Sequence, residues 1–244
     1  MAETWRRLKV DAGVLHQPGC ANTEIRNLGY LQQALYCYRK ACTLDPDDEN
    51  AQWDRALLSI EIGDLRTARA AFLAILKRYP YNISALEELR PILVELSDIP
   101  RGIQLYQDAF EYYQTAYPSG AVKVPSGNEI PGGGFGEMQI IVLADFYISV
   151  NDPDNAVTTI RRGARWLQGR GEQRCWDSEP DDKEYDIEGF VRSDPKGSAT
   201  EPSYPLDLNF RHRLAVARLM LGDHEEGKVT CLSPLPGVGD SRRI

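Results

Sequence analysis

Histidine and cysteine, which build most metal sites and many nucleophilic catalytic sites, are scarce in this sequence. Its 244 residues include three histidines and five cysteines. His16, His212 and His224 share no metal-ligand spacing with one another or with a cysteine. No CxxC pair occurs, and the scattered cysteines do not suggest a disulfide framework. The sequence therefore predicts reduced thiols in an intracellular protein that is not an enzyme and holds no metal or cofactor.

Long apolar runs are absent as well. No stretch approaches the roughly 18 apolar residues of a membrane-spanning helix, so no membrane span is expected. Residues 1–7 are not followed by an apolar run, so no signal peptide is visible. The glycine-rich run 132–136 lacks the Lys-Ser/Thr that follows a phosphate-binding loop and is interpreted as a flexible linker. No small-molecule substrate is implied.

Positive charge is in deficit. The chain has 28 lysine and arginine residues against 36 aspartate and glutamate residues, which gives a net charge of −8 and a pI near 5.0. Because duplex affinity depends mainly on cationic contacts to phosphate, direct DNA binding is disfavoured. Two interpretations of the acidic excess remain, a surface for basic protein partners or a surface that is merely solvated.

A repeat with a period of 34 residues is the main positive signal. Four pairs of positions at this spacing carry matching residue types. The pairs are Gly29 with Gly63, Ala34 with Ala68, Tyr38 with Phe72, and Pro46 with Pro80. Four such coincidences at one period are hard to obtain by chance, and a period in this range indicates stacked helical hairpins.

Each repeated position has a physical role in a pair of antiparallel helices. Gly63 and Asp64 suit the turn, because glycine tolerates the backbone conformation and aspartate caps the next helix. Ala68 is small where the two helices approach closely, and Phe72 is large where successive hairpins pack. Pro80 ends the second helix and begins the connection to the next hairpin.

A third unit follows at the same period. Ser97 and Asp98 replace the Gly-Asp turn, Gly102 takes the small position and Tyr106 the large one. Pro91 falls inside the first helix of this unit and should kink that helix or shift its start.

Two more units follow after insertions. The fourth turns at Asn151 and has Ala156 at its small position. The fifth turns at Gly222 and has Gly227 at its small position. Both ends of the chain lack a regular pattern, so we expect a piece of a longer array with apolar end faces prone to aggregation.

The predicted fold is all-α, an α-solenoid of helical hairpins with two loop insertions. The predicted segments are an irregular or partial N-terminal segment (1–27), repeats (28–116), a Gly/Pro-rich loop (117–136), a repeat hairpin (137–167), an acidic flexible insertion (168–205), a partial repeat (206–230) and an irregular tail (231–244).

The hairpin pattern of residues 28–114 resembles the tetratricopeptide repeat family. A closer resemblance depends on the order of several runs and of the insertions between them. These runs are 34–41, 53–56, 63–64, 144–149, Ala156, 164–167, 176–177 and 205–208. Over about residues 28–228, their order resembles the repeat-containing subunit of RNA polymerase III transcription factor IIIC in its fungal form.

This resemblance implies a nuclear protein–protein interaction scaffold. Its expected partners are the other subunits of transcription factor IIIC and initiation factor IIIB, with DNA contacted only indirectly. Family members are longer and carry more repeats. The alternative is an unrelated tetratricopeptide adaptor in another multiprotein complex, such as one in the cell cycle or in RNA processing.

In tetratricopeptide proteins the first helix of each hairpin faces the partner. In the second helical hairpin of the repeat the corresponding positions are Asn50, Trp53, Leu57 and Ile60. Trp53 has two interpretations, an anchor for a partner segment or a residue that packs against the neighbouring hairpin. The chaperone-binding subclass clamps a C-terminal carboxylate with lysine and asparagine at such places. Acidic and apolar residues stand there in this chain, at Trp53, Asp54, Leu57, Glu87, Glu88 and Pro91.

Two charged segments complete the sequence-based picture. The acidic segment 177–188 is interpreted either as a docking element for a basic partner or as a solvated loop. The basic run comprises Arg161, Arg162, Arg165 and Arg170. It has two possible roles, pairing with the acidic segment or contact with nucleic acid, and the overall negative charge favours pairing.

Overall fold

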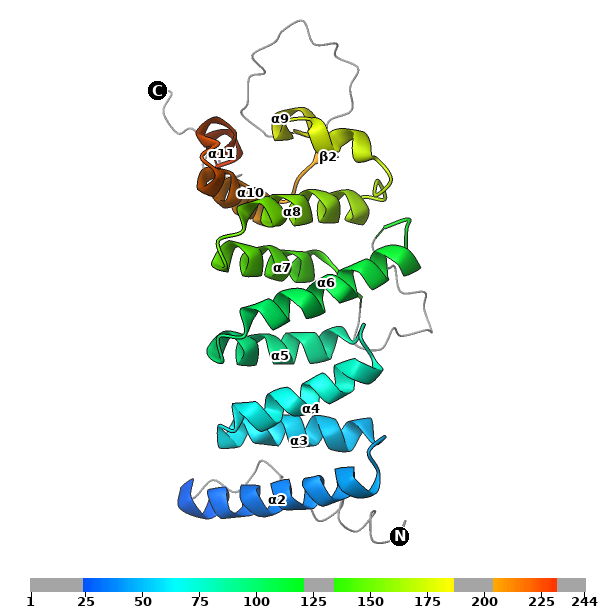
Figure 1. Cartoon of the computed structure of the whole chain (residues 1–244), viewed down its shortest axis with the longest axis vertical. Helices are drawn as coiled ribbons and strands as arrows, with labels where there is room; N and C mark the ends of the chain where they lie inside the picture. The colour runs from blue at the N-terminus through cyan, green and yellow to red at the C-terminus, as the bar shows by residue number, and fades with distance from the viewer. Residues whose placement is uncertain (1–23, 121–133, 187–203, 232–244) are drawn as a thin grey trace, which may run out of the picture. The chain divides into compact units, whose positions relative to one another are not determined.

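The computed structural model describes residues 24–120, 134–186 and 204–231 (Figure 1). These residues divide into two compact units, the first ending at Leu105 and the second beginning at Tyr106. Each unit is described by itself. Both consist almost entirely of helices, which confirms the predicted all-α class.

The first unit is a series of helices joined by short turns. It contains α2 (Glu24–Leu44), α3 (Glu49–Ile62), α4 (Leu65–Arg78), α5 (Ile83–Glu95) and the beginning of α6 (Ile99–Ala116). Helices α3 and α4 lie side by side as one hairpin (Figure 1). Ala68 and Phe72 on α4 are completely buried. Pro46 and Pro80 lie in the loops that follow α2 and α4, where no helical hydrogen bond is lost.

Helix α2 differs from the predicted pattern. Gly29, the counterpart of Gly63 in the repeat, lies inside α2 and not at a turn. The helix instead continues into Ala34, Leu35 and Tyr38, whose side chains join the core shared with α3. Burial of this apolar stripe stabilises one long helix, which outweighs the weak helix propensity of a single glycine.

Four interhelical turns share one backbone conformation. One or two residues after the end of the first helix, φ is positive, at Gly63 (82°), Ser97 (56°), Asn151 (59°) and Gly222 (83°). The next residue is always aspartate, and its N–H donates to the carbonyl five positions earlier. These bonds are Asp64 to Ser59 (2.8 Å), Asp98 to Leu93 (2.8 Å), Asp152 to Tyr147 (2.9 Å) and Asp223 to Arg218 (3.0 Å). This pattern is the Schellman helix ending, which requires the left-handed residue.

Aspartate at these turns also begins the second helix. The Asp64 carboxylate accepts the Thr67 N–H at 3.1 Å and the Thr67 hydroxyl at 2.6 Å. These two hydrogen bonds hold the pKa of Asp64 below its ordinary value, against the smaller opposing effect of burial. One Gly-Asp pair therefore ends α3 and caps α4.

Helix α5 begins at Ile83, directly after its N-cap Asn82 and one repeat period after the start of α3. The predicted shift of its start by Pro91 is therefore wrong. The Asn82 side chain accepts the Ala85 N–H at 3.1 Å, and the helix continues through Pro91 to Glu95. Six residues of this helix are buried. Their burial offsets the one backbone hydrogen bond that Pro91 removes.

The second unit contains longer connections between its helices. After the rest of α6 come α7 (Glu137–Ser149), α8 (Pro153–Leu167), the 3-10 helix η1 (Arg174–Ser178), α9 (Asp181–Glu184), β1 (Tyr185–Asp186), β2 (Tyr204–Pro205), α10 (Leu208–Leu221) and α11 (His224–Cys231). The strands are two residues each and pair in parallel, with Tyr185 opposite Tyr204. Tyr106 and Ala156, two predicted repeat positions, are buried.

An aromatic cluster forms part of the core of this unit. Phe135 stacks on Phe110 with ring centroids 5.3 Å apart, and it also contacts Tyr113. Phe110 in turn meets the Trp166 ring edge-on at 5.9 Å. The end of the predicted Gly/Pro-rich loop is therefore anchored by Phe135, which is 1% exposed. Residues 121–133 of that loop, like residues 1–23 and 232–244, lie outside the described residues.

Candidate partner-binding surface

Helix α3 carries the four residues predicted to contact a partner. It begins after Asp48, whose carboxylate accepts the Ala51 N–H at 3.1 Å, and it ends at Gly63. The four residues are spaced by three or four positions and therefore share one face of the helix. They are Asn50, Trp53, Leu57 and Ile60. We refer to them as the α3 face.

The α3 face is only partly covered by the rest of the first unit. Asn50 is exposed, whereas Trp53, Leu57 and Ile60 are half-buried. The Trp53 ring meets Phe72 of α4 edge-on, with centroids 5.3 Å apart and planes at 85°. Trp53 thus packs within its own hairpin while part of its surface stays accessible. Its role as an anchor for a partner remains a prediction.

Asp54, which follows Trp53, joins α3 to α2. It accepts a hydrogen bond of 3.2 Å from the hydroxyl of Tyr38 on α2. Burial, together with the negative charge of Asp54, raises the pKa of Tyr38. The phenol therefore stays protonated and keeps donating, so α3 is held between α2 and α4 in one orientation.

The exposed side of α5 is mainly acidic. Glu87, Glu88 and Glu95 are exposed there, interrupted by Arg90 and by Val94, an apolar side chain that is 52% exposed. This composition lacks the lysines and asparagines of a carboxylate clamp. It suits instead a partner segment that carries positive charge around an apolar residue.

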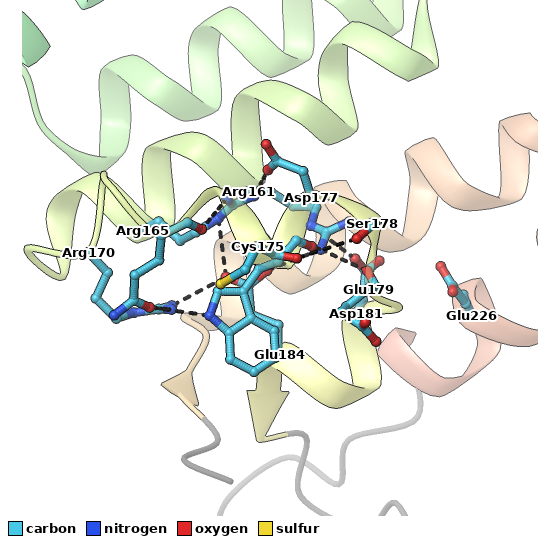
Figure 2. A network of polar contacts seen from close by, with 12 residues as sticks. Arg161, Arg165, Arg170, Cys175, Asp177, Ser178, Glu179, Asp181, Glu184 and Glu226 are labelled. Atoms are coloured by element: carbon cyan, nitrogen blue, oxygen red, sulfur yellow. Dashed lines mark hydrogen bonds and ion pairs between the residues drawn. The ribbon is translucent and has the colours of Figure 1, made fainter.

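The second unit contains a buried network of ion pairs (Figure 2). Arg161 and Arg165 of α8 and Arg170 beyond its end converge on Glu184 of α9. The guanidinium nitrogens of Arg161, Arg165 and Arg170 lie 3.1, 3.2 and 3.4 Å from the Glu184 oxygens. The Glu184 side chain is completely buried, so its charge needs these partners to offset the loss of hydration.

Asp181 extends this network to α10. Arg218 holds both Asp181 carboxylate oxygens, with contacts of 2.8 and 3.0 Å. Arg161 lies 3.5 Å from the same carboxylate. Burial alone would lower the pKa of Arg218, but its hydrogen bonds to Asp181 raise that pKa above the ordinary value. Helices α8, α9 and α10 are thus joined by charges that are mostly buried, with the Arg218 side chain 14% exposed.

Backbone carbonyls accept further hydrogen bonds from the buried arginines. Arg161 donates to the carbonyls of Trp176 and of Glu179, the latter at 2.9 Å. Arg165 donates to the Gln173 carbonyl at 3.0 Å and to the Asp177 carboxylate at 2.6 Å. The arginines therefore organise the whole segment that wraps over α8.

The predicted pairing between the basic run and the acidic segment is confirmed for Arg161, Arg165 and Arg170. Arg162 is different, because its guanidinium donates to Gln114 at 3.2 Å. Arg218 was missed by sequence reasoning, since nothing in its local pattern on α10 indicates an acidic partner 37 residues earlier.

Residues 168–186 of the predicted flexible insertion contain η1, α9 and β1. Their carboxylates, which would favour solvation in an isolated loop, are here enclosed with arginines of α8 and α10 that offset the cost of burial. Residues 187–203 of the same predicted insertion lie outside the described residues.

Chemistry of other kinds finds little support in the part of the chain that the structure describes. No group of three or more metal-ligating side chains could hold an ion there. No described helix is both long and apolar enough to cross a membrane. Cys37, Cys42 and Cys175 form no disulfide, and burial raises the pKa of Cys42, which disfavours its reactive thiolate form.

The chain is similar in sequence to two fungal transcription factor subunits. It is 29% identical over 210 residues to the transcription factor tau subunit sfc4 of Schizosaccharomyces pombe, an alignment covering 83% of this chain and 20% of the relative. It is 25% identical over 240 residues to the transcription factor tau 131 kDa subunit of Saccharomyces cerevisiae, covering 79% and 23%. The predicted resemblance to a fungal factor IIIC subunit is thereby confirmed as a similarity of sequence. The chain spans about a fifth of the length of these relatives.

Two further comparisons concern the fold. The tetratricopeptide repeat family model matches residues 26–48. A crystal structure of the MamA protein superposes with a TM-score of 0.51 at 13% identity, covering 95% of this chain and 90% of that chain. At so low an identity the likeness concerns the fold alone. Together these findings confirm the predicted fold of tetratricopeptide-type hairpins.

Proposed function

We propose that this chain is a protein–protein interaction scaffold within nuclear transcription factor IIIC. In this role it supports assembly of the promoter-bound complex and recruitment of initiation factor IIIB for RNA polymerase III transcription. Its partners are the other factor IIIC subunits and initiation factor IIIB, and it reaches DNA only through them. The single observation that carries the proposal is the 29% identity to the fission yeast tau subunit over 83% of the chain.

The geometry supports a scaffold for a physical reason. A hairpin array presents side chains along successive helices and gives an extended surface for partner segments. The α3 face, partly open and fixed between α2 and α4, is the proposed contact surface of the first unit. The acidic side of α5 favours a basic partner segment, and the acidic chain as a whole is poorly suited to hold duplex DNA directly.

The first test is co-purification. The full chain, carrying an affinity tag, is expressed in Schizosaccharomyces pombe and recovered from nuclear extract. Tau subunits should be enriched at least tenfold over an untagged control, as measured by quantitative mass spectrometry. Recovery with cytosolic chaperones, or with a cell-cycle or RNA-processing complex in place of tau, would contradict the proposal and favour an unrelated adaptor.

The second test addresses the α3 face. Asn50→Arg combined with Leu57→Arg places two positive charges on this surface and should reduce tau recovery at least fivefold, because like charges repel a basic partner segment. The matched control is Ala70→Arg with Ala74→Arg, which adds the same charge to exposed positions of α4. Equal recovery with both variants, at equal helicity by circular dichroism, would remove the α3 face from the proposal.

A further inference from the structure

A pocket of about 360 Å³ lies in the second unit, and its volume is within the range of ligand-binding sites. Gln114 and Pro118 line it from the end of α6 and the following turn. Arg162 and Arg165 line it from α8. The segment after α8 contributes the remaining wall, including Arg174. The proposed function leaves this pocket without a role.

One wall of the pocket is rigid. Trp166 is 1% exposed, and its indole N–H donates to the Tyr117 carbonyl at 2.8 Å. Arg165 beside it is held by the Gln173 carbonyl and by the Asp177 carboxylate. Binding of a ligand would therefore cost little conformational entropy in these side chains, because they are already held in place.

Two other arginines in the wall keep most of their donors available. Arg162 is exposed and uses one nitrogen to donate to Gln114 at 3.2 Å. Arg174 is also exposed. Within residues 24–120, 134–186 and 204–231, neither forms an ion pair with a carboxylate. Since a guanidinium has five N–H donors, each of the two side chains can donate to an oxyanion in the pocket.

The pocket has an excess of positive charge in an otherwise acidic chain. Three arginines line it, against the carboxylates of Glu172 and Asp177. Asp177 is already engaged, because it accepts from Arg165 at 2.6 Å. Arg162 and Arg174 thus remain as the groups that attract an anion.

We propose that this pocket binds a carboxylate-bearing peptide segment of a partner protein. Arg162 and Arg174 hold the acidic side chains by charge-assisted hydrogen bonds. A peptide fits better than duplex DNA, because a single extended chain can enter a pocket of about 360 Å³ and a rigid duplex can only touch its rim. The inference is independent of the proposed function.

Gly171 offers a way to block the pocket without touching its charges. A Cβ added there would lie 3.8 Å from Trp166 Cδ1 and 4.0 Å from the Pro118 carbonyl oxygen, which are ordinary contact distances. A longer side chain at this position extends into the pocket without strain at its base. Gly171→Leu should therefore fill the site while leaving the three arginines in place.

The test measures binding to the full purified chain by fluorescence anisotropy. The probe is a fluorescein-labelled hexaglutamate peptide in about 50 mM salt, with labelled hexalysine and a labelled 20-base-pair duplex as comparison probes. Arg162→Glu with Arg174→Glu should weaken hexaglutamate binding at least tenfold, and Gly171→Leu at least fivefold. The matched control is Arg66→Glu with Arg90→Glu, two exposed arginines of the first unit, and it should change affinity less than twofold.

Three results would overturn the proposal. The first is no saturable binding of hexaglutamate by the wild-type chain. The second is equal weakening by the control pair, which would mean that only net charge matters. The third is tighter binding of the duplex than of hexaglutamate with the same sensitivity to Arg162 and Arg174. Unchanged helicity of each variant by circular dichroism excludes unfolding as the cause of lost binding.

Discussion

Ser97 and Asn151 hold a backbone conformation that costs free energy for any residue with a Cβ. Their φ values of 56° and 59° place them in the left-handed region, where Gly63 and Gly222 stand in the other two turns. Asparagine tolerates this region better than serine, because its short polar side chain bonds locally. Of the four turns, the one at Ser97 therefore carries the largest backbone strain.

Ser97→Gly should raise the free energy of unfolding by about 0.5–1 kcal/mol. The strain removed is about 1–2 kcal/mol, and the greater freedom of glycine in the unfolded chain offsets part of it. Urea denaturation followed by circular dichroism measures the change. Ser97→Ala keeps the Cβ and should give no gain.

Gly63→Ala supplies the reverse control for the same argument. Nothing lies within 4 Å of a Cβ built at Gly63, so any loss comes from the backbone alone. The expected loss is about 1 kcal/mol. A gain in stability for Gly63→Ala, or a loss for Ser97→Gly, would show that the turns do not require the left-handed conformation.

At the scale of helices, the close approach of α7 and α8 depends on a residue that the repeat pattern did not single out. The repeat motif placed the small residue of this hairpin at Ala156, which is buried. A further close approach lies at Gly163, where an added Cβ would come within 2.6 Å of Ile140 Cγ2. Contacts this short do not occur without movement, so the Ile140 side chain or the two helices would have to shift.

Gly163→Ala should lower the free energy of unfolding by about 1–3 kcal/mol, because the extra methyl group overpacks the interface. Combining it with Ile140→Ala should cost less than the sum of the two single losses, since the shortened side chain makes room. Urea denaturation of the three variants gives the coupling. The control is Gly171→Ala, whose Cβ meets only ordinary contacts and should change stability by less than about 0.5 kcal/mol. Strict additivity of the pair would contradict the predicted clash.

For the whole molecule, a repeat architecture confines the effect of a substitution to neighbouring elements. In such arrays each unit contacts mainly the next, so stability is close to a sum of local terms. The ion-pair network around Glu184 joins α8, α9 and α10 of the second unit. Disrupting this network should therefore lower the stability of these three helices and leave the stability of the α3–α4 hairpin unchanged.

Glu184→Gln keeps the shape of the side chain but removes the charge that three arginines surround. Leaving buried arginines without this partner should cost about 3 kcal/mol locally. Hydrogen exchange followed by mass spectrometry should show faster exchange in residues 161–184 and 208–221, and unchanged exchange in residues 49–78. Glu179→Gln is the control, because its exposed pair with Lys183 contributes at most about 1 kcal/mol. Faster exchange throughout the chain would contradict the local picture.

The sequence by itself determined the helical hairpins of this protein. Turn residues, small residues and caps act over a few positions, so a 34-residue period predicted the turns at Gly63 and Ser97, and the same local motif after each insertion predicted the turns at Asn151 and Gly222. The resemblance to a fungal factor IIIC subunit likewise came from the order of local motifs. Local patterns misplaced Gly29, however, because the burial of α2 against α3 decides where that helix runs.

Only the tertiary structure decided which charged side chains after α8 are buried and which partners they pair with. As a sequence, residues 168–186 favour solvation, because carboxylates are most stable in water when no partner is near. Folding brings Arg161 and Arg218 from different helices to Asp181, and this long-range pairing makes burial favourable. The same packing leaves Arg162 and Arg174 beside a pocket, since which arginine finds a carboxylate depends on distance in space and not on spacing along the chain.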